Sequence, residues 1–318
     1  FASVSRYPEM FYSDLLKPTL IRRFGEANLD PKNIFLGHGS FNLAERIILA
    51  FVAPRALLGY GPQFNEIPTE AHAMGRRYKP LPLMDGFVFP LKGIIEELSS
   101  GRYSMLYLDN PNNPTGFLLS LETLEQLIVA AESVGTIVLV DEAYGDFVAD
   151  ECSAFNLVRN YSNVIVVRSM SKALGLAAQR VGYMAISDPL IQYYSKVDVP
   201  FEPTFISAIM AKLTLKDDTF IAKVRHLARE CKDRITAALR QAELEILPTH
   251  LDVSIFMAYK SGINLFAHFQ RLGIKVENGA AYIRTNNSMN SSFVRIRVPN
   301  QEQTEEVVQR IQTHEFID

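Results

Sequence analysis

The segment VVRSMSKALGLAAQR (166–180) places one lysine among hydroxyl groups and small apolar side chains. Ser169, Ser171 and Arg180 accompany Lys172, and two hydroxyls with a guanidinium in one loop are typical of a phosphate site. A lone lysine is usually solvated, but alanine, leucine and glycine follow this one, so we expect a desolvated amine suited to nucleophilic chemistry. The segment therefore predicts a reactive amine beside a bound phosphate.

A second candidate is the carboxylate that ends the apolar run of TIVLVDEAYGDF (136–147). Asp141 ends this run, and Tyr144 follows three residues later. A carboxylate at a buried strand end is costly unless it is paired, so Asp141 should face a cation or a protonated nitrogen. The alternative is an aspartate that only caps the following helix.

Three asparagines crowd into the turn of YLDNPNNPTGF (107–117). Asn110, Asn112 and Asn113 all suit a tight turn, but a turn needs only one or two such residues. A remaining amide could donate a hydrogen bond to a ligand oxygen. Because ligands of parallel sheets collect at the carboxyl ends of strands, this turn is a further part of the candidate site.

The segment NIFLGHGSFNLAERIILAF (33–51) is typical of a strand, a glycine-rich turn and a helix. The unpaired N–H groups at such a helix start form an anion site, although Ser40 acting as a plain N-cap explains the pattern as well. A nicotinamide-dependent oxidoreductase is a further alternative. A dinucleotide fingerprint, however, requires a third glycine and an acidic residue near Leu58, and the sequence has neither.

Two arginines alternate in FVRIRV (293–298) and so share one face of a predicted strand. An arginine fork can bind a substrate carboxylate through two hydrogen bonds. The alternative is a surface strand with salt-bridged arginines. Only one fork is needed, so that alternative suits Arg297 better than Arg295.

The elements that position these residues follow from the apolar pattern. Short, continuous apolar runs alternate with segments of helical period, such as 172–179, as far as about Pro200. Continuous apolarity indicates strands buried on both faces, which predicts an α/β fold with a mostly parallel sheet sandwiched by helices. Beyond this point a long charged helix and strand-like segments predict a smaller α+β C-terminal domain. These segments are 223–242, 254–259, 273–277, 281–285 and 293–298.

We therefore expect three parts in the chain. Residues 1–30 would be an N-terminal segment that packs at a dimer interface or on the small domain. Residues 31–205 would form the large ligand-binding domain, and residues 206–318 a small domain that closes over the substrate. Closely packed domains are expected, since no Gly/Ser linker separates them.

Composition limits the partners. The 318 residues carry a formal charge of -3, without the basic surface that nucleic acid or an anionic membrane requires. The apolar runs are shorter than the roughly 18 residues of a membrane span. Two cysteines are too few for a disulfide framework or a zinc site. These features favour a cytoplasmic protein that binds a small molecule and no metal.

The candidate segments occur in the same order and with similar spacing in one enzyme family. They are RYPE (6–9), GHGS (37–40), NPNNPTG (110–116), VDEAYGDF (140–147), SMSKALGLAAQR (169–180) and VRIRV (294–298). Together they resemble the class I/II aminotransferases, pyridoxal 5'-phosphate enzymes of fold type I, and most closely the histidinol-phosphate aminotransferase branch. The resemblance covers nearly the whole chain and implies an enzyme of amino-acid biosynthesis.

The resemblance also implies roles for individual residues. Lys172 would form the Schiff base, Asp141 would pair with the pyridine nitrogen, and Tyr144 and Asn113 would bind the phenolic oxygen. Other residues would bind the cofactor phosphate or stack on the ring, and a third group would bind the substrate. The phosphate group is Gly39, Ser40, Phe41, Ser169, Ser171 and Arg180; the stacking ring is Phe64; the substrate group is Arg295, Arg284 and Asn113. Tyr7 would reach the phosphate of the neighbouring subunit, which implies a homodimer with shared active sites.

The resemblance implies transfer of an amino group from an amino acid, or a phosphate such as histidinol phosphate, to a 2-oxo acid. A decarboxylase of a phosphorylated amino acid, like threonine-phosphate decarboxylase, is the alternative on the same scaffold. A non-catalytic pyridoxal-phosphate-binding module is a third possibility, but it would not need Lys172. Arg297 departs from the branch, which commonly has a small polar residue at this position.

Overall fold

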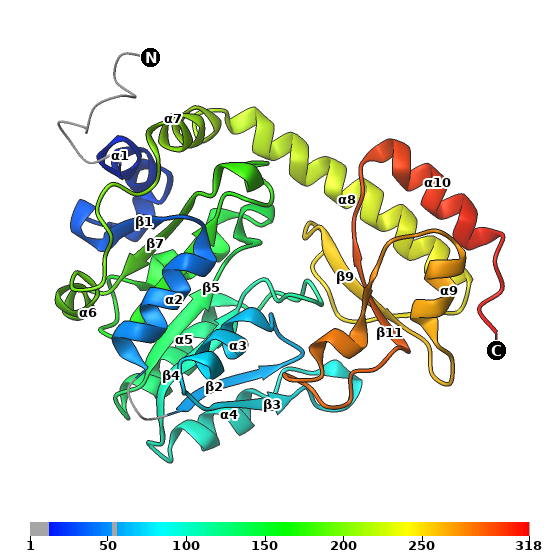
Figure 1. Cartoon of the computed structure of the whole chain (residues 1–318), viewed down its shortest axis with the longest axis horizontal. Coiled ribbons are helices and arrows are strands. Elements are labelled where there is room, and N and C mark those ends of the chain that lie inside the picture. The colour runs from blue at the N-terminus through cyan, green and yellow to red at the C-terminus, as the bar shows by residue number, and fades with distance from the viewer. Residues whose placement is uncertain (1–12, 53–55, 318) are drawn as a thin grey trace.

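The computed structural model describes residues 13–52 and 56–317, so Tyr7 lies outside the described residues. Two sheets form the frame of the molecule, one of seven strands and one of four (Figure 1). The long helix α8 (Asp218–Gln241) runs from the side of the larger sheet to the smaller one (Figure 1). None of the helices in this part of the chain is both long and apolar enough to cross a bilayer.

The larger sheet has the strand order β1-β7-β6-β5-β4-β2-β3. Neighbouring strands from β3 to β6 are parallel, whereas β7 is antiparallel to both of its neighbours. The predicted mostly parallel sheet is thus confirmed. The strands are β1 (Ile34–Gly37), β2 (Ala56–Gly61), β3 (Tyr78–Pro82), β4 (Tyr103–Asp109), β5 (Ile137–Asp141), β6 (Val164–Ser169) and β7 (Gly182–Ile186).

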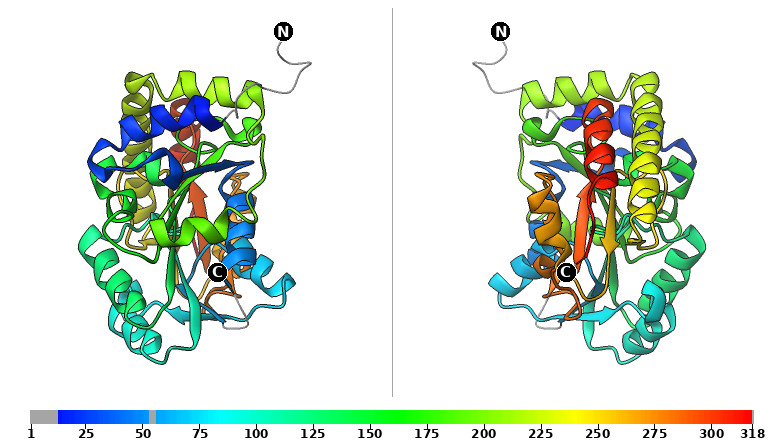
Figure 2. Two further views of the ribbon diagram at one scale, coloured as in Figure 1. Left: turned by 90° about the vertical axis from the view of Figure 1, so that its left-hand side faces the viewer. Right: turned by 90° about the vertical axis from the view of Figure 1, so that its right-hand side faces the viewer.

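Helices cover both faces of this sheet (Figure 2). Val138 and Val140 of β5 pack into one apolar cluster, and Leu139 packs into the cluster on the opposite face. Because successive strand residues point to opposite faces, burial of both faces requires the continuous apolar runs seen in the sequence. The helices on the first face are α1 (Ser13–Arg23), α4 (Leu91–Leu98), α5 (Leu121–Glu132) and α7 (Phe205–Thr214); those on the second are α2 (Ser40–Phe51), α3 (Glu66–Ala73) and α6 (Asp188–Tyr194).

The smaller sheet is antiparallel, with the order β10-β11-β9-β8. Val294 and Ile296 of β11 join an apolar cluster with α8, α9 and α10, so Arg295 and Arg297 point to the opposite face. The strands are β8 (Glu245–Ile246), β9 (Ile255–Tyr259), β10 (Glu277–Asn278) and β11 (Phe293–Arg297), and the other helices are α9 (Leu265–Arg271) and α10 (Gln301–Gln312).

Three predicted elements are wrong. Of residues 273–277 only Glu277 lies in a strand, because Gly273, with a φ of +65°, belongs to the turn that follows α9. Residues 172–179 form turns and a single 3-10 turn, Ala177–Gln179, because the chain reverses at Gly175 with a φ of +70°. Residues 281–285 are not a strand. The Asn278 side chain accepts a hydrogen bond from the N–H of Ala280 and starts the 3-10 turn Gly279–Tyr282 instead.

Candidate functional site

One cavity of about 770 Å³ lies at the carboxyl ends of β4, β5 and β6 and extends to β11. It brings together most of the residues predicted from the sequence, although these are up to 255 positions apart (295 minus 40). Gly39 does not line the cavity itself but is the residue before Ser40, which does. Arg284 does not line the cavity. The predicted residues that line it are Ser40, Phe41, Phe64, Asn113, Asp141, Tyr144, Ser169, Ser171, Lys172, Arg180 and Arg295.

Lys172 presents its amine to this cavity. The Nζ atom lies 5.4 Å from the centroid of the Tyr144 ring. The expectation that this lysine is desolvated is wrong, because its side chain is exposed. The chain turns so that Ala173 and Leu174 take the buried positions beside it. Ala173 and Leu174 are therefore buried in the protein interior, while the Lys172 amine stays accessible from the cavity.

Asp141 caps the turn that follows its strand, and its pairing with a cation or a protonated nitrogen stays a prediction. Its Oδ1 accepts a hydrogen bond from the N–H of Ala143 at 2.9 Å, which caps the turn after β5. The other carboxylate oxygen accepts no hydrogen bond from the described residues. Burial and, to a smaller extent, the nearby Asp109 carboxylate raise the pKa of the Asp141 carboxyl to about 7. A cationic ligand group would stabilise this carboxylate.

The three asparagines divide into structural and available amides. Asn110 accepts from the N–H of Leu119, at 2.7 Å. Asn112 donates to Pro62 O at 3.1 Å and accepts from the Thr115 hydroxyl. The Asn113 side chain lines the cavity, and its buried Oδ1 has no hydrogen-bond partner among the described residues. Only the Asn113 amide is thus available to a ligand.

Asp109 is a cavity residue that the sequence analysis missed. Its Oδ2 accepts from the backbone N–H groups of Phe64, at 3.1 Å, and Asn113, at 3.0 Å. Burial raises the pKa of this carboxyl to about 6, although these hydrogen bonds oppose the shift. Asp109 ends the apolar run of β4 just as Asp141 ends that of β5. The same pattern could therefore have found it.

The predicted anion site lies at the start of α2, and its occupation by an anion stays a prediction. Gly39 is the N-cap with a φ of +86° and no side-chain cap, so the expectation of Ser40 as N-cap is wrong. Arg180 Nη1 donates to Ser171 Oγ at 3.2 Å. A Cβ on Gly39 would lie 2.6 Å from Arg180 Nη2, so only glycine lets the guanidinium approach the helix start. Backbone N–H groups, a hydroxyl and a guanidinium therefore converge here.

The two arginines of β11 differ from the expectation. Arg295 Nη1 forms an ion pair with Glu277 at 2.7 Å, and its Nη2 donates to the Tyr144 hydroxyl at 2.8 Å. Arg297 is exposed in the cavity wall and has no hydrogen-bond or ion-pair partner in the described part of the chain. Arg295 rather than Arg297 is thus salt-bridged. Elsewhere, Arg284 Nη1 donates to Thr69 Oγ1 at 2.9 Å.

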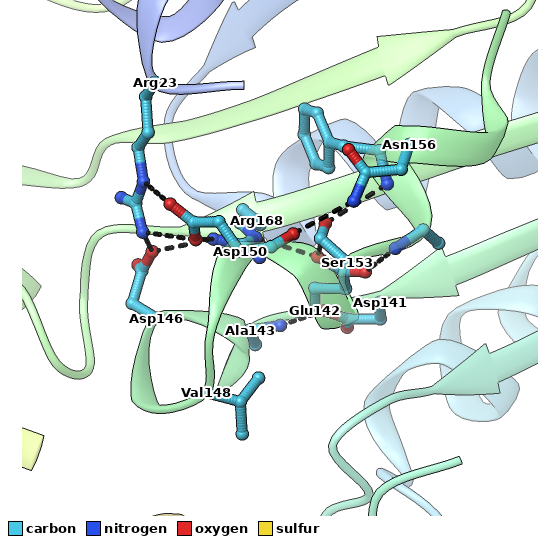
Figure 3. Close-up of polar contacts among 12 residues, drawn as sticks. Arg23, Asp141, Glu142, Ala143, Asp146, Val148, Asp150, Ser153, Asn156 and Arg168 are labelled. Carbon is cyan, nitrogen blue, oxygen red and sulfur yellow. Dashed lines mark hydrogen bonds and ion pairs between the residues drawn. The ribbon is translucent and has the colours of Figure 1, made fainter. Parts of the chain in front are cut away.

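A buried ionic cluster lies behind Asp141 (Figure 3). Arg168 is fully buried and pairs with Glu142 at 2.8 Å, Asp146 at 3.0 Å and Asp150 at 3.2 Å. Arg23 of α1 reaches the same cluster and pairs with Asp146 and Asp150, each at 2.8 Å. The carboxylates raise the pKa of Arg168 against the effect of burial, so its guanidinium stays charged.

This cluster fixes two strand ends of the site. Glu142 follows Asp141 at the end of β5, and Arg168 precedes Ser169 at the end of β6. The Arg168–Glu142 ion pair joins these two strand ends (Figure 3), and neither side chain lines the cavity. It therefore ties together the two strand ends that carry Asp141 and Ser169.

Comparison with known proteins identifies the family of this chain. The family model for class I and II aminotransferases matches residues 1–311. The chain belongs to this aminotransferase family. As a member, it is an enzyme that transfers amino groups with pyridoxal phosphate as its cofactor.

The relatives of this aminotransferase are named for different substrates. A histidinol-phosphate aminotransferase of Clostridium novyi is 29% identical over 301 residues, which is 93% of this chain and 81% of that protein. An aromatic amino acid aminotransferase of Mycolicibacterium vanbaalenii is 32% identical, covering 77% of this chain and 69% of that protein.

The fold is shared with solved structures of the family. The histidinol-phosphate aminotransferase of Sinorhizobium meliloti, in complex with pyridoxal-5'-phosphate, superposes with a TM-score of 0.81 at 20% identity. The match covers 98% of this chain and 83% of that one. The cavity here fits the same cofactor, because a free amide, an uncapped helix start and a buried carboxylate meet beside an accessible lysine.

Proposed function

We propose that this aminotransferase moves the amino group of an amino acid, or of an amino-phosphate such as histidinol phosphate, to a 2-oxo acid. The observation that carries the proposal is the meeting of Lys172, Asp141 and Arg295 in one cavity. An amine, a carboxylate and a guanidinium supply a proton acceptor, a partner for a ring nitrogen and a carboxylate clamp.

Each cavity residue has a distinct task in holding the cofactor. Asp141 pairs with the pyridine nitrogen, while Asn113 and Tyr144 bind the phenolic oxygen. The Phe64 ring stacks on the pyridine. The phosphate binds at the uncapped start of α2, where the ligands are the N–H groups around Gly39, Ser40 and Phe41 and the side chains of Ser169, Ser171 and Arg180.

Lys172 carries the chemistry. Its amine would hold the cofactor covalently and would become available as a free base once an amino substrate takes its place. When bound, pyridoxal phosphate supplies an electron sink for the bonds at the substrate Cα. The freed Lys172 Nζ accepts the Cα proton and later returns it, while Arg295 holds the substrate carboxylate in place.

The test uses the purified protein supplied with pyridoxal phosphate. We expect a visible absorbance band, and borohydride should attach the cofactor covalently to the wild-type protein. The control is Lys92→Ala, which changes an exposed lysine on α4 and keeps Lys172; it should behave as wild-type protein does. Lys172→Ala should lose the covalent attachment. A cofactor still fixed by borohydride in Lys172→Ala would contradict the role of this lysine.

A panel of amino acids that includes histidinol phosphate then identifies the donor from the spectral change. Formation of a keto product supports transamination, whereas release of carbon dioxide would support the alternative decarboxylase of a phosphorylated amino acid. Arg295→Ala should keep the cofactor but lose the response to amino acids. Loss of the cofactor from this variant would show that Arg295 binds the cofactor instead.

We also propose a cytoplasmic homodimer in which Tyr7 of each subunit reaches the phosphate of the other. This arrangement would complete each site with a group from the second copy. Sedimentation of the purified protein measures the assembly directly, and a monomer that retains full activity would contradict it.

A further inference from the structure

A second cavity, of about 730 Å³, adjoins the first at the edge of the small sheet. It lies between β11, the chain leading into β10 and one side of α10. Arg295 and Arg297 line both cavities, so the two spaces meet at these side chains. The space beside Lys172 and the second cavity are therefore neighbours that share this part of their walls.

The charges of the second cavity do not cancel. Glu277 is paired with Arg295 at 2.7 Å, and Glu306 is paired with Arg310 on α10. These pairs use both carboxylates of the lining. Lys275 and Arg297 remain, and neither has a carboxylate or other hydrogen-bond partner within residues 13–52 and 56–317. The second cavity thus offers two uncompensated cations to a ligand.

We propose that Arg297 determines substrate specificity by binding a second anionic group of the substrate, a carboxylate or a phosphate, in this cavity. The proposal rests on the transamination described above, in which Arg295 holds the first carboxylate. Lys275 adds positive charge at the far side of the same space.

The strand geometry sets the size of this substrate. Arg295 and Arg297 are two residues apart on one face of β11, which places their backbones about 7 Å from each other. A substrate with two anions separated by about this distance can contact both side chains, which extend from the same face of the strand. This separation matches a dicarboxylate, or a carboxylate with a phosphate, on a chain of about five heavy atoms.

Unreactive substrate-like anions test the proposal without turnover. The probes are pentanoate, glutarate and 4-phosphonobutyrate, titrated into holoenzyme at fixed ionic strength with the cofactor absorbance and calorimetry as readouts. A charge-assisted hydrogen bond is worth about 1.5–3 kcal/mol, so wild-type protein should bind at least one dianion about tenfold or more tightly than pentanoate. The tighter of the two dianions identifies the second group as carboxylate or phosphate.

Variants locate the effect. Arg297→Gln should reduce the preference for the dianion to about threefold or less while leaving pentanoate binding unchanged, and Lys275→Gln should reduce it in part. Arg271→Gln, an exposed arginine on α9 outside both cavities, is the matched control and should bind all three probes as wild-type protein does.

Three results would overturn the proposal. They are equal affinity of wild-type protein for all probes, an equal loss of pentanoate and dianion binding in Arg297→Gln, and the same loss in Arg271→Gln. Failure of the proposed function is recognised separately, because it would show as a cofactor spectrum that no amino donor changes.

Discussion

Asn112 and Asn113 are adjacent in the chain but have opposite environments. Asn112 is nearly fully buried and bonds to Pro62, Asp109 and Thr115, whereas the Asn113 amide faces the cavity without a partner in the described residues. Asn112→Ala should therefore destabilise the protein by about 1–3 kcal/mol, because it leaves buried polar groups unsatisfied. Asn113→Ala should change stability by less than about 1 kcal/mol and instead alter the cofactor absorbance.

Urea unfolding and absorbance spectra of the two variants check this difference, each serving as the control for the other. The reverse pattern, with a destabilised Asn113→Ala and an unaffected Asn112→Ala, would show that the hydrogen bonds have been misinterpreted.

At the scale of single residues, the sequence predicts which types can bind the cofactor but not which are already used. The repeated asparagines of 110–113 indicate a ligand-binding turn, yet only the three-dimensional contacts separate Asn113 from the other two. The same holds for Arg295 and Arg297, because Glu277 lies on a different strand from both. Pairing partners distant in the chain are invisible to local spacing.

At the scale of elements, the anion site depends on how closely α2 approaches β7. A Cβ at Gly182 would lie 2.3 Å from the carbonyl carbon of Gly39 and 2.4 Å from the nitrogen of Ser40. Gly182→Ala must therefore displace the start of α2, at a cost of about 1–3 kcal/mol. We expect weaker binding of pyridoxal phosphate, measured by equilibrium dialysis.

Gly25→Ala is the matched control, since nothing lies within 4 Å of a Cβ built there. Its stability should change by no more than about 0.5 kcal/mol, with unchanged cofactor affinity. A Gly182→Ala protein with wild-type affinity would show that the helix start can shift without affecting the phosphate site.

The elements themselves were largely predictable where hydrophobicity alone decides them. The runs that became β4, β5 and β6 are buried on both faces, so nearly all residues ahead of their polar strand ends are apolar and the pattern is clear. The segment 172–179 has the apolar content of a helix, but Gly175 has a positive φ, which a right-handed helix does not allow. The strand prediction for 281–285 was also wrong, because the Asn278 side chain caps a 3-10 turn that includes the start of this segment.

At the scale of the whole molecule, buried carboxyls link stability to pH. Burial raises the pKa of Asp141 to about 7, whereas an unfolded chain ionises this group near pH 4. Between these values the unfolded state binds fewer protons, so stability falls as pH rises. The cofactor-free wild type should lose up to about 1.4 kcal/mol per pH unit in this window relative to Asp141→Asn.

Urea unfolding of the cofactor-free proteins between pH 4.5 and pH 8, at intervals of about half a unit, measures this difference. Asp85→Asn removes an exposed carboxylate and should give a curve parallel to that of wild type. Parallel curves for wild type and Asp141→Asn would contradict the shifted titration of Asp141.

The sequence predicts two sheets but not how they meet. The Arg295–Tyr144 hydrogen bond joins β11 to the segment after β5 across 151 residues. Apolar periodicity describes only which face of an element is buried, so it contains no information on this contact.

The buried cluster around Arg168 also orders events during synthesis. Arg23 leaves the ribosome 127 residues ahead of Asp150, and Arg168 follows later still. A guanidinium placed in the protein interior without its carboxylates would cost several kcal/mol, so Arg23 cannot be buried before Asp146 and Asp150 have been made. Helix α1 is therefore made before its ionic partners, and it can back the cofactor site only after Asp146 and Asp150 have followed it.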